Sequence, residues 1–570
     1  MPLLPLSAFI ALQHAQLGVV PVVAQAGTAL LPLITLAITS LVGLLLNPRA
    51  LLGALRRRPW IPAVMVALAL AIWGGLAWLT GAPGAPLVDA RSQAGPAAGA
   101  GTRPDWARVA LLVLAQEAAA KGNQARSEPP KSLSGPSADP AVVTGAPAVP
   151  GARSFRGDAC RSGYLGGIAP RGLAPGWTYA SPSDEFAMHL SSPMVVGGAV
   201  YGASCSLDPP HSFGRIFRLD AATGDPVWTC ESRHPAGKLP FKGFISSPAL
   251  SADGRYLVIG QGLHTDYDSE LVCLDAATGA VHWLVPTPLH IESSPSIAGD
   301  LVVAGAGAVE QGRDHRPTGD VNGHGHPGLV LGVRISDGHE VFRATVHDPE
   351  GSPLLVDGIC YVASGLNGSA VVALRTQSDE ELGKAGLARE LWRTATPFPA
   401  TGAVTLADEV VLVGCGNGDF IMTAEHPEGR VIALDKVTGQ ERWQAAMPDA
   451  VLGPIAVAGH VAIVPVRNGE VIAIDLAARG RVLWQARVHK DAPVLAGVAF
   501  TGALVYAVAN DGHLAVFDAA DGRLLEKAYL NGQGRPGELG LSTSSPLVLD
   551  GRLFVGSETG GLRCLIGTAP

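Results

Sequence analysis

Histidine and carboxylate side chains stand just before a turn that recurs along most of this sequence. The turn is Ser-Pro or a close variant, as at Ser192-Pro193 and Ser294-Pro295. Because the turn recurs, the residues before it occupy equivalent places in a repeated unit. Imidazole and carboxylate groups brought together can bind a cation or a polar ligand. The residues of this set are His189, His290, Glu292, His347, Asp348, Glu350 and Asp449.

A second candidate site is the insertion from Glu310 to Gly328, which is rich in oxygen and imidazole ligands. The start of this insertion resembles a calcium loop, but a histidine replaces the third oxygen ligand and Leu331 stands where the bidentate Glu belongs. A transition-metal site and an ordinary solvated loop both remain open interpretations. The candidate metal ligands are Asp314, Asp320, Asn322, His324 and His326.

Tryptophan recurs at a fixed distance after an Asp and a Gly. In one copy Asp275 precedes Gly279 by four residues and Trp283 by eight. The Asp side chain can cap a tight turn, and Gly accepts the positive φ that such a turn requires. We therefore expect the indoles to dock one repeat on the next and to have no part in catalysis. These tryptophans are Trp177, Trp228, Trp283, Trp392, Trp443 and Trp484.

Each repeat is expected to be a sheet of four short strands. In the clearest copy, runs rich in Val and Ile alternate with turn residues such as Asn468-Gly469, a strong hairpin signal. The predicted strands are Ile455–Val457, Val461–Pro465, Glu470–Asp475 and Arg481–Ala486. A unit of four strands that recurs about every 40 to 60 residues predicts the blades of a β-propeller.

The number of blades follows from the way the ring closes. Seven repeats are visible, and an eighth begins at Ser545-Pro546 but runs out after three strands. A strand near 176–180 has no partner before it and supplies the fourth strand. The sequence therefore predicts an all-β, eight-bladed propeller of four-stranded repeats over residues 154–570, with the His and carboxylate set at its channel mouth. Polar side chains also line any solvated channel, so this set does not require a ligand.

Two apolar runs predict a membrane anchor over residues 1–80. Residues 28–46 and 61–79 are uncharged and long enough to cross a bilayer. The loop between them carries Arg49 and Arg56 to Arg58, so the positive-inside rule places this loop in the cytoplasm and the propeller outside it, in the periplasm. Whether residues 1–24 form a third membrane segment stays open.

Residues 81–153 form a linker rich in Pro, Ala and Gly, within which 104–121 is expected to be a short helix.

Lys and Arg together number 41 against 49 Asp and Glu, so no basic surplus points to nucleic acid. The seven cysteines show no zinc spacing, and a disulfide involving Cys160, Cys205 or Cys230 stays open.

The Asp-x-x-Thr-Gly-x-x-x-Trp unit resembles the PQQ-like repeat of the quinoprotein superfamily, and the opening motif at Phe155 to Gly163 resembles the start of bacterial PQQ-repeat propellers. The resemblance covers roughly residues 155 to 570. It implies either a PQQ-dependent alcohol dehydrogenase or a propeller of the BamB type, which binds proteins and holds no cofactor. In the dehydrogenases the quinone stacks between a Trp and an adjacent Cys-Cys disulfide, and a calcium ion is bound.

This chain has no Cys-Cys pair, and every Trp after Trp106 lies in a docking motif. We therefore expect the BamB-type branch, with neither PQQ nor calcium. The predicted function is a non-catalytic scaffold at the membrane whose partner is an envelope protein or polymer. Two alternatives stay open: a PQQ-dependent or other redox enzyme, and a ligand-binding sensor.

Overall fold

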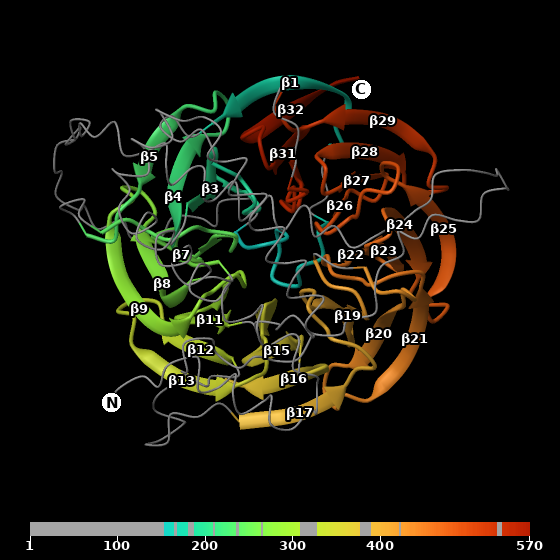
Figure 1. Ribbon diagram of the computed structural model, residues 1–570, viewed down its shortest axis with the longest axis horizontal. Coiled ribbons are helices and arrows are strands. Elements are labelled where there is room, and N and C mark those ends of the chain that lie inside the picture. The colour runs from blue at the N-terminus through green and yellow to red at the C-terminus, as the bar shows by residue number, and fades with distance from the viewer. Residues whose placement is uncertain are drawn as a thin grey trace, which may run out of the picture. The chain divides into compact units, whose positions relative to one another are not determined.

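The computed structural model describes residues 153–569, except 165–167, 181–186, 209–210, 235–238, 264–265, 308–327, 367, 377–388, 421–422 and 533–538. Within this part, the strands form eight four-stranded antiparallel sheets arranged in a ring (Figure 1). The prediction of an all-β, eight-bladed propeller is confirmed. The predicted membrane segments, the linker and the metal-ligand insertion lie outside the described residues. Among the described residues, no helix is long and apolar enough to cross a membrane.

We number the blades in chain order. Blade 1 contains β2 (Met194–Val196), β3 (Ala199–Asp208), β4 (His211–Asp220) and β5 (Pro226–Cys230). Blade 2 contains β6 (Ala249–Leu250), β7 (Tyr256–Gly260), β8 (Tyr267–Asp275) and β9 (Val281–Leu289). Blade 3 contains β10 (Ser296–Ala298), β11 (Leu301–Ala306), β12 (Leu329–Arg334) and β13 (Glu340–Thr345). Blade 4 contains β14 (Gly351–Val356), β15 (Ile359–Ser364), β16 (Ala370–Arg375) and β17 (Arg389–Ala395).

The second half of the ring repeats this order. Blade 5 contains β18 (Thr405–Ala407), β19 (Val410–Gly416), β20 (Gly429–Asp435) and β21 (Glu441–Met447). Blade 6 contains β22 (Ala456–Ala458), β23 (Val461–Val466), β24 (Glu470–Asp475) and β25 (Arg481–Arg487). Blade 7 contains β26 (Ala499–Phe500), β27 (Leu504–Val508), β28 (His513–Asp518) and β29 (Leu524–Tyr529). Blade 8 contains β30 (Leu547–Leu549), β31 (Arg552–Gly556), β32 (Leu562–Ala569) and β1 (Arg171–Tyr179).

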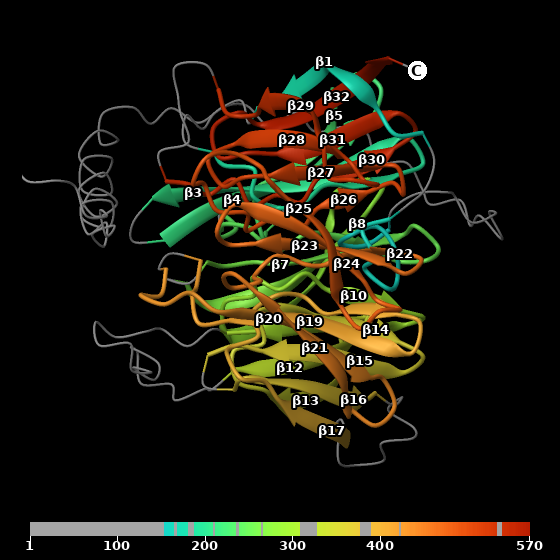
Figure 2. The same cartoon turned by 90° about the vertical axis from the view of Figure 1, so that its right-hand side faces the viewer.

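Blade 8 closes the ring by pairing the two ends of the described chain. Strand β1 runs antiparallel to β32, with Trp177 opposite Cys564, and the two lie side by side in both views (Figure 2). A bulge between Pro175 and Trp177 shifts the register within β1. The closing strand predicted near 176–180 is thus the end of a longer strand. Closure by pairing leaves no open edge between the first blade and the last.

The packing between blades explains the apolar pattern of the inner strands. In blade 6 the strand β23 is buried at every position but its first, whereas the outer strand β25 is mostly exposed. One apolar cluster joins Ile463 and Val471 of blade 6 to Val505 and Phe517 of blade 7. Because each inner strand packs against a neighbour on both faces, its sequence is apolar throughout and does not alternate.

Tryptophans and glycines join adjacent blades. The indole Nε1 of Trp228 in blade 1 donates a hydrogen bond to the carbonyl of Ala276 in blade 2 at 3.2 Å. A Cβ at Gly279, whose φ is +74°, would lie 2.6 Å from the Trp228 ring. Asp275 caps the same turn, because its Oδ1 accepts the Thr278 amide at 2.9 Å. The repeated residues build six of the eight joints between blades in this way.

Serine side chains link the starts of the inner strands. The amide of Ser192 donates to Ser247 Oγ at 3.0 Å, and the amide of Ser247 donates to Ser294 Oγ at 3.0 Å. The chain continues from Ser294 to Ser352 and, in the other direction, from Ser545 to Ser192, each at 2.9 Å. These serines are those of the recurrent Ser-Pro turn, so the turn serves the closure of the ring.

Residues 153–164 lie across the centre of the ring, where Figure 1 shows them as a blue-green trace. Four carbonyl oxygens of this segment accept hydrogen bonds from backbone amides of four blades. The Leu250 amide donates to Arg153 at 2.8 Å, and the Leu406 amide donates to Cys160 at 3.1 Å. The Val457 amide donates to Ser162 at 2.7 Å, and the Phe500 amide donates to Gly163 at 2.9 Å. Leu250 and Phe500 end their inner strands. This segment therefore closes the channel at the end where the inner strands finish.

Two arginines of this central segment are buried. The guanidinium of Arg161 donates to the carbonyls of Ser352 and, at 3.0 Å, Ser294. Burial lowers the pKa of Arg161 to about 9 and that of Arg156 to about 10. The channel axis is thus filled by the chain itself near these residues.

Candidate functional site

The propeller has two unlike faces, which follow from its topology. In a four-stranded antiparallel blade, the connection between the second and third strands and the link to the next blade lie at the same end. We call this end the loop face, because it carries the links between blades and the connection from β19 to β20. The opposite end carries the short Asp-Gly turns and is called the turn face. Binding residues commonly sit on such loops, held by a rigid scaffold.

The predicted channel-mouth residues all lie in links between blades on the loop face. His189 precedes β2, His290 and Glu292 connect β9 to β10, and Asp449 connects β21 to β22. His347 and Asp348 follow β13, and Glu350 directly precedes β14. Four of the seven are buried, since the exposed fraction is 1% for His189, 2% for His290, 1% for Asp348 and 2% for Asp449. Glu292, His347 and Glu350 are partly exposed.

The structure brings two of these residues together. His290 Nε2 lies 3.4 Å from Glu350 Oε1, so links on either side of blade 3 meet. Asp348 instead contacts blade 4, the blade that follows it, because its Oδ2 accepts a hydrogen bond from the Leu366 amide at 2.7 Å. Any Cβ at Gly365 would lie 2.1 Å from that same oxygen. Asp348 therefore holds the β15–β16 connection in place.

His189 and Asp449 lie in interior surroundings. The His189 ring packs against Tyr179 and Phe217, with centroids 6.0 and 5.8 Å away. Burial lowers the pKa of His189 to about 4, so this ring is neutral at pH 7. Burial also raises the pKa of Asp449, although the amide of Ala450 and the charge of Arg467 oppose the shift. Both groups pack inside the loop face and do not present their polar atoms to solvent.

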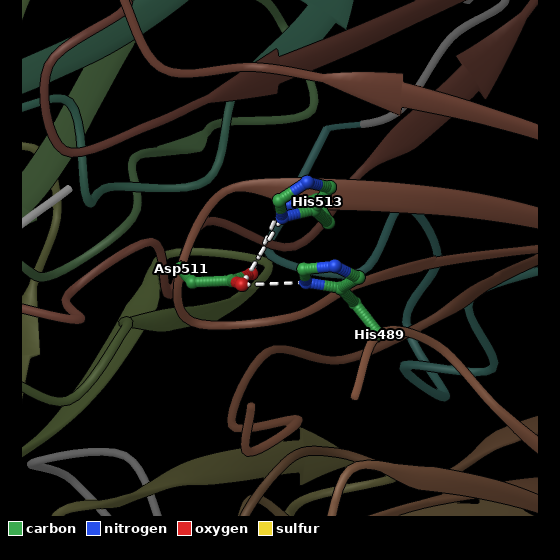
Figure 3. Close-up of side chains that lie close together, drawn as sticks. All are labelled: His489, Asp511 and His513. Carbon is green, nitrogen blue, oxygen red and sulfur yellow. Dashed lines mark hydrogen bonds and ion pairs between the residues drawn. The ribbon is translucent and has the colours of Figure 1, made fainter. Parts of the chain in front are cut away.

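A further polar cluster on the loop face was missed by sequence reasoning. His489 lies in the link from blade 6 to blade 7, Asp511 lies in the β27–β28 turn, and His513 begins β28 (Figure 3). His489 Nδ1 and His513 Nδ1 lie 2.7 and 3.0 Å from Asp511 Oδ2. The two imidazole rings stack with centroids 3.5 Å apart and 29° between their planes. In sequence the only signal is the short Asp511-Gly-His513 turn.

The aromatic and sulfur groups that a quinone site requires have other positions here. Five of the six repeat indoles donate to a carbonyl of the next blade, at 2.8 to 3.3 Å: these are Trp177, Trp228, Trp283, Trp392 and Trp484. The sixth, Trp443, lies against Gly480 of the next blade. All seven cysteines are free, so the disulfide left open at Cys160, Cys205 or Cys230 is not formed.

Blade 7 has Glu526 where other repeats have the indole, and this residue also joins two blades. Its carboxylate accepts the amides of Gly172 at 3.1 Å and Leu173 at 2.7 Å, both in β1 of blade 8. The carboxylate is therefore engaged at the ring closure.

A protein-family model described as outer membrane protein assembly factor BamB matches residues 212–316 and 367–569 of this chain. Among curated proteins, outer membrane protein assembly factor BamB of Nitrosomonas eutropha is 28% identical over 173 residues, which are 30% of this chain and 41% of the relative. Quinoprotein alcohol dehydrogenase PedH of Pseudomonas putida is 24% identical over 252 residues, which are 43% of this chain and 36% of the relative. The chain thus covers less than half the length of either relative.

Two solved structures resemble the propeller. Quinohemoprotein alcohol dehydrogenase of Comamonas testosteroni has a TM-score of 0.53 at 15% identity, over 74% of this chain and 81% of that one. BamB of Moraxella catarrhalis has a TM-score of 0.48 at 15% identity, over 70% of this chain and 98% of that one. At this identity the likeness to the first concerns the fold alone.

Proposed function

The chain belongs to the family of PQQ-repeat propellers described as outer membrane protein assembly factor BamB, and from this premise we propose that it is a non-catalytic scaffold that binds an envelope protein. The proposal includes the membrane anchor over residues 28–46 and 61–79 and a propeller on the periplasmic side, both argued from the sequence. The relative from Nitrosomonas eutropha carries the name of an assembly factor, which supports a protein partner. An envelope polymer is the other partner class.

One observation carries the non-catalytic part of this proposal: the indoles are engaged in joints between blades. A quinone cofactor of the dehydrogenase kind needs an indole face on which to stack. Trp228 and Trp484 instead donate to neighbouring blades and pack over the glycines of those blades. The adjacent cysteine pair of the dehydrogenases has no counterpart among the seven cysteines of this sequence. The residues present therefore do not fit PQQ, although PedH is among the relatives.

The loop face is the surface that we assign to the partner. It carries the links between blades and the connection from β19 to β20, and it also carries the partly exposed residues Glu292, His347 and Glu350 of the predicted set. The turn face offers short turns whose Asp and Gly already serve the joints between blades. A partner recognised through loops of several blades would use the ring as a rigid support.

Site-specific photo-crosslinking in cells tests this assignment. Glu425 in the β19–β20 connection and Val437 in the β20–β21 turn are both exposed and lie at opposite ends of the same strand. With a photoreactive residue at Glu425 or Lys490 we expect an adduct of one discrete mass, and with the same residue at Val437 we expect none. Adducts at Val437 alone, or equal adducts on both faces, would contradict a loop-face partner.

The competing function is PQQ-dependent oxidation, and a titration separates the two. We expect the purified full-length chain, titrated with PQQ and Ca²⁺, to show neither a saturable change in absorbance nor a rise in melting temperature. Saturable binding together with alcohol-dependent dye reduction would overturn the non-catalytic assignment.

Replacing Glu292 and Glu350 with Ala tests the channel-mouth set, since unchanged crosslinking would exclude these two carboxylates from partner binding.

A further inference from the structure

Three potential metal ligands from two blades converge on the loop face. His489 lies in the link between β25 and β26. Asp511 lies in the turn between β27 and β28, and His513 is the first residue of β28 (Figure 3). One ligand atom from each residue lies within 4.8 Å of the other two. Both histidines direct Nδ1 at the same carboxylate oxygen, Asp511 Oδ2. We propose that these three side chains form a binding site for Zn²⁺ or a divalent transition metal of similar chemistry.

The distances between the ligand atoms are close to those that a metal requires. Ligands at about 2.1 Å from a tetrahedral Zn²⁺ lie about 3.4 Å from one another. The two nitrogens lie 2.7 and 3.0 Å from Asp511 Oδ2, so these distances must lengthen by about 0.7 and 0.4 Å to admit the ion. A metal ion bound here would displace any proton held between these atoms and keep the same three ligand atoms.

The surrounding backbone holds the ligands in position. The Asn510 amide donates to the Pro493 carbonyl at 2.8 Å, which fastens the turn carrying Asp511 to the link carrying His489. The side chain of Asn531 donates to the Asp511 carbonyl at 3.0 Å. The amide of His513 donates to Asp511 Oδ1 at 3.2 Å, which leaves Oδ2 for the metal. Such supporting contacts are typical of metal sites.

The arrangement of the rings also suits one shared ion. The two imidazole rings stack with centroids 3.5 Å apart, and the Nδ1 atoms of both face Asp511 Oδ2. One cation can therefore meet both nitrogens and the carboxylate. Imidazole ligands select Zn²⁺ and related ions over Ca²⁺ and Mg²⁺, which prefer oxygen.

Three protein ligands leave one coordination position for water or for another molecule. The side chains are 18%, 31% and 29% exposed for His489, Asp511 and His513, so solvent reaches the cluster. Metal sites with three protein ligands keep such an exchangeable position, whereas purely structural zinc sites are closed by four. The site stands apart from the scaffold function and does not depend on it.

Cobalt titration of the full-length chain, purified without a histidine tag, tests the proposal. Tetrahedral Co²⁺ has intense visible bands, so binding is read directly from the absorption spectrum. We expect one equivalent to bind the unmodified protein and the affinity to fall at least tenfold in His489→Ala, His513→Ala and Asp511→Asn. Asp511→Asn keeps the oxygen that caps the turn, so its fold is preserved. Zn²⁺ should raise the melting temperature of the unmodified protein and of none of these three variants.

The histidine-rich insertion provides the matched control. The double variant His324→Ala/His326→Ala removes the two histidines among the candidate ligands of the insertion and should leave the cobalt spectrum unchanged. Bands that persist in all three cluster variants, or that vanish only in the insertion variant, would place the metal elsewhere and overturn the proposal. The absence of saturable cobalt binding to the unmodified protein would overturn it as well.

Discussion

His189 has neither ring nitrogen hydrogen-bonded within the described residues, and it is enclosed by aromatic side chains. Protonation would place an unpaired charge in this apolar setting, and for this reason burial lowers the pKa of His189 to about 4. An unfolded chain takes up the same proton at the ordinary histidine pKa of about 6.5. The unfolded state therefore binds more protons than the folded state between these two values, and stability falls as the pH falls from about 6.5 to about 4.

We predict that His189→Leu removes this part of the acid sensitivity. The contribution amounts to about 3 kcal/mol of unfolding free energy between pH 7 and pH 4. Unfolding of the full-length chain should therefore depend less steeply on pH in the variant than in the unmodified protein. His426, which is exposed, provides the control, since His426→Leu should leave the slope as it was. Equal slopes for all three proteins would show that His189 is protonated without penalty.

At the scale of elements, six of the eight joints between blades combine a turn glycine with an indole of the preceding blade. Gly279 and Gly254 both belong to blade 2 and have φ of +74° and +77°. A Cβ at Gly279 would lie 2.6 Å from Trp228, whereas a Cβ at Gly254 meets nothing within 4 Å. An alanine at either position would therefore be strained by the positive φ, but only an alanine at Gly279 would also clash with the Trp228 ring.

We predict that Gly254→Ala costs about 1 kcal/mol, because alanine disfavours a positive φ. Gly279→Ala should cost at least twice as much, because the methyl group also separates blade 1 from blade 2. Chemical unfolding of the two variants measures the difference. Equal losses would mean that the indole moves aside at no cost and that the joint is looser than its geometry indicates.

The elements were predictable where the repeat itself contains the physical signal. The four strands expected in blade 6 lie within one residue of β22, β23, β24 and β25 at each end. Each of these strands is bounded by a turn whose residues are needed for its geometry, such as Asn468-Gly469. The central segment over 153–164 could not be foreseen in the same way, because its backbone partners are amides of four distant blades.

The cluster of His489, Asp511 and His513 escaped prediction for a related reason. His489 lies in the link before blade 7 and His513 begins β28, and only the fold brings this link beside the β27–β28 turn. By contrast, the predicted channel-mouth residues were assigned to equivalent links, but the sequence does not say which of them turn inward. Their burial depends on packing against distant strands, as with His189 against Phe217.

At the scale of the whole molecule, blade 8 is the place where the ring is joined by pairing and not by chain continuity. Strand β1 is fastened to β32, to the Ala221 carbonyl through Trp177 and to blade 7 through Glu526. Loss of the β1–β32 pairing would open the ring and expose two strand edges. This pairing should therefore limit the stability of the propeller.

We predict that a disulfide between Ala174→Cys and Ile566→Cys, which are partners in the register of β1 and β32, raises the melting temperature. A crosslink that closes so long a loop stabilises by up to about 5 kcal/mol in the chain-entropy description. The reduced form of the same variant is the control, and the gain should vanish on reduction. Identical melting of both forms would show that opening begins at another joint.

The pairing of β1 with β32 also determines the order in which the blades can fold during translation. Thr568 donates a hydrogen bond to the carbonyl of Gly172, and the two residues are 396 positions apart. A ribosome adds about 5–20 residues per second, so β1 waits on the order of 20 to 80 s for β32 to be made. Blades 1 to 7 each consist of consecutive strands and can form during synthesis, whereas blade 8 cannot. A growing chain therefore carries an unpaired β1 until β32 emerges, and a chain that terminates before β32 keeps β1 unpaired.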